Sequence, residues 1–188
     1  MHVDGLSNIK VLIILPQNKF QDEEFLTVEL QLNKGHIEYN TVACRDKIAT
    51  GSSGIRVKPD YTFNNIDFID YDAVILIGGV GSIEHWHNKK VLKLLAKANR
   101  FGKLICAICL APVTLANAGL LKNKRATAYD SAATYLRSKG AIFTGSSIEI
   151  SDNIITANGP EAAKEFAEAI VGHLAGRNDL MNADKAKK

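Results

Sequence analysis

The chain has 188 residues, of which 46% are hydrophobic and 23% charged, and its formal net charge is +3. This length predicts a single domain over residues 1–188, with a core at about residues 9–175 between a short N-terminal tail and a Lys-rich C-terminal tail. The small net charge, without a long basic run, argues against nucleic acid as a partner. No apolar run approaches the about 20 residues that span a bilayer, which argues against a membrane.

Cysteine usage and the N-terminal residues indicate the compartment. The 3 cysteines form no framework of the secreted type. The first residues lack the basic start and the apolar stretch of a secretory signal. We therefore expect a cytoplasmic protein.

Apolar strands and amphipathic helices are predicted to alternate along the chain. In the first part of the chain, the patterns predict a strand at residues 9–15, a helix from Asp22 to about residue 34, a strand at 38–43, a small hairpin or excursion at 48–55 and an irregular stretch at 60–70. The middle part is predicted to contain a strand at 73–77, a helix at 89–100, a strand from residue 104 to the turn at Cys109 and a short helix at 110–116. The last part is predicted to contain a short strand at 126–129, a helix at 132–139, a hairpin of strands at 148–150 and 154–157, and a last helix from residue 160. This alternation predicts an α/β fold with a mostly parallel central sheet and helices on both faces.

Ligands of such sheets bind beyond the carboxyl ends of the strands. Three features of the sequence fall at such ends: the acidic residues 22–24, the Gly-rich residues 78–82, and Cys109. We expect these three features to converge on one site.

Cys109 is the best candidate for a nucleophile. It lies where a buried strand turns into a short helix that has Pro112 in its first turn. The N–H groups and the dipole of a helix start stabilise a thiolate and can receive an oxyanion. A buried carboxyl group nearby would have a raised pKa and could share or shuttle the proton of the thiol. The alternative is that Cys109 is only a small buried hydrophobic residue.

The other cysteines and the glycine loop have simpler interpretations. Cys106 forms a C-x-x-C with Cys109 but falls inside the strand, so a redox pair is disfavoured, and Cys44 is interpreted as packing. No second pair of ligands has the spacing of a zinc site, and residues 78–81 match neither phosphate-binding glycine motif. We expect no metal and no cofactor.

Four more residues are possible accessories of the site. His85 and His87 could supply a base or cover the site, but a solvated surface loop is the favoured interpretation. Tyr129 and Asp130 follow a strand end, where they would either line the pocket or cap the next helix.

Several motifs together resemble the DJ-1/PfpI superfamily, which has a flavodoxin-like, class I glutamine amidotransferase-like fold. The matching segments are F-Q-D-E-E at residues 20–24, G-G at 78–79, A-I-C at 107–109 followed by Pro112, A-G-L-L-K at 118–122 with R-A-T at 125–127, and I-T-A-N-G-P at 155–160. The resemblance extends over about residues 9–174. It implies a three-layer sandwich with a nucleophile elbow, and a homodimer or larger homo-oligomer.

The resemblance also implies roles for individual residues. Cys109 would be the catalytic nucleophile, prone to oxidation to sulfinic acid, and Glu24 its paired carboxyl group. Backbone N–H groups of Gly79, Val80 and Leu110 would hold the oxyanion.

Four departures from the family pattern bear on the activity. Leu110 stands where the peptidase and glyoxalase-rich branch has histidine, and Tyr129 where the DJ-1-like branch has histidine. Asn158 replaces an arginine, and Ala111 replaces a common glycine.

Three functional hypotheses follow. The favoured one is a cysteine-dependent enzyme of stress protection that acts on small reactive carbonyls or their adducts, like a glyoxalase or deglycase. The second is a non-enzymatic redox sensor or chaperone-like stress protein, which the missing histidines favour. The third is an intracellular cysteine peptidase or an enzyme like isonitrile hydratase.

Overall fold

A sheet of 7 strands runs through the centre of the molecule in the order β11-β12-β8-β7-β1-β3-β6. The computed structural model describes residues 8–185, and side chains for residues 8–177. Residues 1–7 of the predicted N-terminal tail and residues 186–188 of the Lys-rich tail therefore lie outside the described residues. All neighbouring strands are parallel except β11 and β12, which form the predicted hairpin. The strands are β1 (Lys10–Ile14), β3 (Glu38–Ala43), β6 (Tyr61–Thr62), β7 (Ala73–Leu76), β8 (Leu104–Ile108), β11 (Ile148–Ser151) and β12 (Ile154–Ala157).

Strands β7 and β8 are apolar along their whole length because helices cover both faces of the sheet. In β1, Val11 and Ile13 belong to one hydrophobic core, while Leu12 and Ile14 belong to the other. Strands β7, β8 and β12 are buried at every position.

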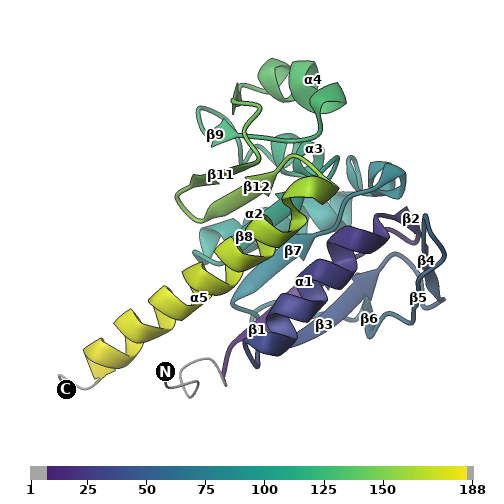
Figure 1. Cartoon of the computed structure of the whole chain (residues 1–188). Coiled ribbons are helices and arrows are strands. Elements are labelled where there is room, and N and C mark those ends of the chain that lie inside the picture. Colours follow the sequence, from purple (N-terminus) through teal and green to yellow (C-terminus); the bar gives the residue numbers. More distant parts are fainter. Residues whose placement is uncertain (1–7, 186–188) are drawn as a thin grey trace.

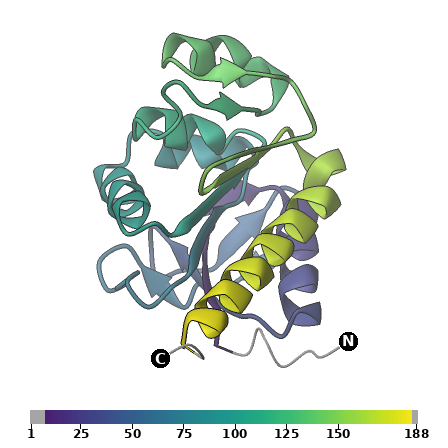
Figure 2. The same cartoon turned by 90° about the vertical axis from the view of Figure 1, so that its left-hand side faces the viewer.

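Helices form the two outer layers (Figures 1 and 2). Helices α1 (Asp22–Lys34) and α5 (Ala163–Lys185) lie side by side on one face. Helices α2 (Lys89–Arg100), α3 (Pro112–Asn117) and α4 (Ala133–Ser138) belong to the opposite face and its core. The predicted three-layer α/β sandwich is therefore confirmed. Helix α5 continues past the predicted end of the core at residue 175.

Short elements surround the sheet. Strands β2 (Asn18–Phe20), β4 (Ala49–Gly51) and β5 (Arg56–Val57) form a small sheet that includes the predicted excursion, and β9 (Arg125–Ala126) pairs with β10 (Ile142–Phe143). The 3₁₀ turns are η1 (Val80–His85), η2 (Asp130–Ala132) and η3 (Pro160–Ala162). No helix within residues 8–185 combines the length and the apolar character needed to cross a bilayer.

Two predicted segments differ from the structure. The strand predicted at residues 126–129 is only β9, because beyond it the backbone turns to other partners: Thr127 N donates to Thr156 Oγ1, and Tyr129 N donates to the carbonyl of Cys109. The irregular stretch at 60–70 contains β6, which pairs with the end of β3.

Candidate active site

Cys109 occupies a strained turn between β8 and α3. Its φ angle is 63°, in the left-handed region that residues other than glycine rarely adopt. The turn is fixed on both sides, because Cys109 N donates to the carbonyl of Ala157 (3.0 Å) and the carbonyl of Cys109 accepts from Tyr129 N (2.8 Å). Strain of this kind persists only where the surroundings enforce it, and it concentrates at functional sites.

Glu24 brings a buried carboxyl group to this turn from the first turn of α1. Its side chain is 0% exposed, and its Oε2 accepts a hydrogen bond of 2.9 Å from Gly78 N. Its Oε1 has no hydrogen-bond partner among the described residues. Burial raises the pKa of Glu24 to about 8, although hydrogen bonds from Gly78 and the Cys109 thiol act in the opposite direction. At neutral pH the carboxyl group is therefore largely protonated and can donate a hydrogen bond.

The Cys109 thiol is not the low-pKa thiolate that the helix start led us to expect. Burial, and then the negative charge of Glu24, raise the pKa of Cys109 to about 11. Backbone N–H groups of Gly79 and Leu110 lower the pKa of the thiol, but they do not outweigh the loss of solvent. Helix α3 adds little because it is short and begins at Pro112, which has no N–H.

The glycine loop after β7 gives the site its shape. A Cβ atom on Gly78 would lie 2.6 Å from the Cβ of Cys109 and 2.8 Å from Glu24 Oε2, so only glycine fits there. The glycine pair is visible in the sequence, but no local pattern indicates that Gly78 donates to Glu24. Val80 begins η1 with its side chain 61% exposed, and it is not among the groups that act on the Cys109 thiol.

The two candidate histidines, His85 and His87, differ in their exposure to solvent. The surface-loop interpretation is wrong for His85, which is 1% exposed because η1 turns its ring inward against Phe63, with 5.9 Å between ring centres. Burial lowers the pKa of His85 to about 4. His87 is exposed, as a surface loop requires. Neither is among the described groups that act on Cys109 or Glu24.

Trp86, between these histidines, is the residue of the segment that reaches the elbow. Its indole N–H donates to the carbonyl of Leu110 (3.2 Å), and its ring stacks on Tyr135. Residues 85–87 therefore contact the elbow through Trp86, which was not among the residues predicted from the sequence.

A cavity of about 570 Å³ lies next to the elbow. Tyr129, whose N–H is bonded to Cys109, contributes to its lining, and so does Asp130. The other lining residues are Glu23, Asn158, Gly159, Pro160 and Glu161. The lining thus carries acidic groups but no basic one, and Asn158, at the position of the family's arginine, adds no positive charge.

The remaining cysteines lie outside this arrangement. All 3 cysteines are free thiols. Cys106 is completely buried within β8, so it points into the core and does not form a redox pair with Cys109.

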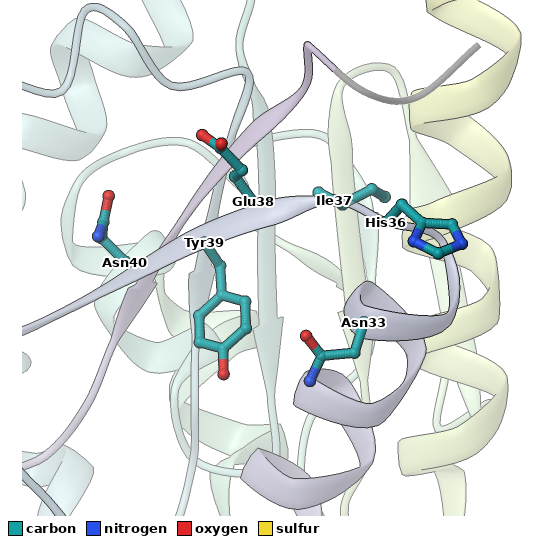
Figure 3. A pocket seen from close by; sticks show the side chains of 6 residues that line it. All are labelled: Asn33, His36, Ile37, Glu38, Tyr39 and Asn40. Carbon is teal, nitrogen blue, oxygen red and sulfur yellow. The ribbon is translucent and has the colours of Figure 1, made fainter. Parts of the chain in front are cut away.

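A second cavity, of about 440 Å³, lies where α1 leads into β3 (Figure 3). It is lined by Asn33, His36, Ile37, Glu38, Tyr39 and Asn40, and the side chains of Glu38 and Tyr39 point to opposite sides of the strand. This cavity is at the amino end of a parallel strand, whereas ligand sites of such sheets lie at the carboxyl ends. The elbow remains the candidate active site.

Comparisons with known proteins identify the family of this chain. The model of the DJ-1/PfpI family matches residues 9–173. Deglycase PfpI of Pyrococcus furiosus is 30% identical over 63% of this chain and 71% of its own, and the glutathione-independent glyoxalase DJR-1.2 of Caenorhabditis elegans is 27% identical over 88% of each chain. The crystal structure of a ThiJ/PfpI domain protein from Brachyspira murdochii is similar with a TM-score of 0.87 and 27% identity, covering 91% of this chain and 98% of that one.

Proposed function

Because this protein belongs to the DJ-1/PfpI family, we propose that it is a cysteine-dependent enzyme acting on small reactive carbonyl compounds or their adducts with amines. Relatives named deglycase and glyoxalase support this class of chemistry. The observation that carries the proposal is the buried Glu24 carboxyl group beside the thiol of Cys109 on its strained turn.

The proposed reaction begins with addition of the thiol to an aldehyde. The Cys109 proton passes to the Glu24 carboxylate, and a C–S bond forms while the carbonyl electron pair moves to oxygen. The carboxylic acid then protonates that oxygen, which gives a hemithioacetal. Since the pKa of Glu24 is about 8, only a minor fraction of the enzyme carries the carboxylate base at neutral pH. The Gly79 and Leu110 N–H groups support the charge on sulfur.

The acidic cavity favours one group of substrates. Glu23, Asp130 and Glu161 would repel anionic compounds, attract cationic ones and leave neutral ones without charge repulsion. α-Oxoaldehydes such as methylglyoxal are neutral, and their adducts on lysine or arginine side chains carry no negative charge, so neither would be repelled. A deglycase-like substrate is therefore preferred over a carboxylate-bearing one.

A specific observation also favours the redox-sensor hypothesis. Glu24 Oε1 has no hydrogen-bond partner among the described residues, and the protonated carboxyl group next to Cys109 would donate a hydrogen bond to an oxygen atom added to its sulfur. The peptidase hypothesis has less support, because no described histidine acts on Cys109.

A homodimer forms part of the proposal. Leu26 and Leu30 lie one turn apart on α1 and are 42% and 51% exposed, so together they present an apolar stripe that a second copy would cover. Sedimentation of wild type and of Leu30→Glu tests this: a dimer that dissociates in the variant is expected, and a monomeric wild type would exclude it.

The enzyme proposal is tested with methylglyoxal and with a methylglyoxal-modified arginine derivative, followed by NMR. Turnover is expected to vanish in Cys109→Ser and to fall about tenfold or more in Glu24→Gln, because the proton partner is lost. Cys44→Ser, which removes a thiol outside the site, should keep wild-type turnover. Activity retained by Cys109→Ser would refute the proposal. Absence of turnover, together with selective peroxide oxidation of Cys109, would support the sensor instead.

A further inference from the structure

A second group of reactive side chains lies at the carboxyl edge of the sheet, apart from Cys109 and Glu24. Cys44 directly follows β3, and Glu84 and His85 end the 3₁₀ turn η1. One possible ligand atom from each residue lies within 4.8 Å of the other two. The distance from His85 Nε2 to Glu84 Oε1 is 3.4 Å. Sequence spacing did not reveal this cluster, because Cys44 is far from the other two residues along the chain.

His85 Nε2 is the most informative atom of the cluster. The side chain is 1% exposed, yet Nε2 has no hydrogen-bond partner among the described residues. A buried polar atom without a partner costs free energy, so native structures rarely keep one without a use for it. Imidazole nitrogen is a common metal ligand, and a bound cation would give this atom the partner that it lacks.

We propose that Cys44, Glu84 and His85 bind one divalent cation of the Zn²⁺ type, with a fourth position open to a water molecule. Sulfur, imidazole nitrogen and carboxylate oxygen are the ligands that Zn²⁺ uses in proteins, and 3 protein ligands with one open position is an established arrangement. Cys44 and Glu84 are only half-buried, which leaves the ion a route from solvent.

Neighbouring residues hold the ligands in place. Gln17 links both segments: its backbone N–H donates to Glu84 Oε1, while its side chain accepts from Arg45 N (2.9 Å) and donates to the carbonyl of Lys47 (2.9 Å). Asn88 Nδ2 donates a weak hydrogen bond to Cys44 Sγ, with 3.7 Å between the two atoms. Outer contacts of this kind orient metal ligands and raise affinity.

Titration with Co²⁺ tests the site, since Co²⁺ replaces Zn²⁺ and reports thiolate ligation by its absorption. The matched control is Cys109→Ser, which removes the thiol of the active site and leaves the cluster intact. Wild type and Cys109→Ser are expected to bind one equivalent with a thiolate-to-metal band. Cys44→Ala should lose that band. Glu84→Gln, which keeps an acceptor for Gln17 N, should bind more than about tenfold more weakly.

Two results would overturn the proposal. One is the absence of saturable binding by wild type. The other is a band that survives in Cys44→Ala and disappears in Cys109→Ser, which would place the metal at the nucleophile. If Cys44→Ala does not fold, X-ray absorption of Zn²⁺-loaded Cys109→Ser decides, because a shell with only nitrogen and oxygen would exclude Cys44.

Discussion

Glu24 Oε2 accepts its 2.9 Å hydrogen bond from Gly78 N, so the carboxyl group beside Cys109 is held by the backbone of the loop after β7. Glu24 comes from α1, Gly78 from this loop and Cys109 from the elbow after β8. None can move without disturbing the other two, because the Gly78 backbone lies in contact with both side chains. This contact leads to the first prediction.

Replacing Gly78 with alanine should damage both stability and activity. The new Cβ would lie 2.6 Å from the Cβ of Cys109, so the elbow must shift. Overpacking of this kind costs about 1–3 kcal/mol of unfolding free energy. Urea denaturation and carbonyl turnover measure the two effects. Gly172→Ala is the control, since nothing lies within 4 Å of its added Cβ, and it should be neutral or slightly stabilising. An active, stable Gly78→Ala would show that the elbow tolerates displacement.

The stability of the metal-free protein should fall as pH rises from 6.5 to 8. The folded pKa of Glu24 is about 8 and its ordinary value is 4.5, so in this range the folded state keeps a proton that the unfolded chain has lost. The linkage slope for one proton is about 1.4 kcal/mol per pH unit, which gives a loss of about 1–2 kcal/mol over the window.

His85 contributes the opposite slope, which is strongest below pH 6.5 and fades above it. Its folded pKa of about 4 lies below its ordinary value of 6.5, so the unfolded chain binds a proton there that the folded state lacks. Urea denaturation at several pH values measures the effect. Glu24→Gln should lose this decline between pH 6.5 and 8, whereas Glu165→Gln, which changes an exposed carboxyl group on α5, should keep it. Identical profiles in wild type and Glu24→Gln would exclude a raised pKa of Glu24.

Alkylation of Cys109 should become faster when Glu24 loses its charge. The carboxylate raises the pKa of the thiol, so Glu24→Gln should lower that pKa and speed the reaction with iodoacetamide above pH 8, where wild-type Glu24 is ionised. Mass spectrometry assigns the modified cysteine, and Cys44 in the same sample provides an internal reference. An unchanged profile at Cys109 would mean that thiol and carboxyl group titrate independently.

Asp22 should stabilise the turn between β4 and β5. Its two carboxylate oxygens accept from Ser53 N (2.8 Å) and Ile55 N (2.9 Å), and its side chain is 5% exposed. Asp22→Ala should lower the unfolding free energy by about 2–3 kcal/mol, because hydrogen bonds to a charged acceptor are lost. Chemical denaturation measures this. Ser53→Ala keeps the backbone donor and should change little; equal losses in both variants would assign the effect to the Ser53 side chain.

The sheet could be predicted because its inner strands are buried on both faces and therefore read as apolar runs. Strands β1, β7 and β8 lie where such runs occur. Elements with few residues could not be predicted in this way. Strand β6 depends on pairing of Tyr61 and Thr62 with β3, a contact between distant segments that leaves no local pattern.

For the site, local patterns located the elbow but not its electrostatics. Pro112 and the apolar run before Cys109 predicted the turn, and the family resemblance paired it with Glu24. The raised pKa of Cys109 depends on how completely other elements bury the thiol, which no local motif records. Asp22 shows the same limit: the pattern predicted a helix that starts there, but not that its side chain bonds to the turn at Ser53 and Ile55.

The bond from Cys109 N to the carbonyl of Ala157 has a consequence during protein synthesis. The partner of the elbow is translated 48 residues after the cysteine itself. At ordinary rates of translation this interval lasts about 2–10 s. Until then the nascent chain exposes Cys109 as a common thiol, outside the turn and without β12 beside it. The ribosome-bound protein is therefore most open to unwanted alkylation before its last strand emerges, and an oxidant or electrophile present then meets a cysteine that the finished fold would shield.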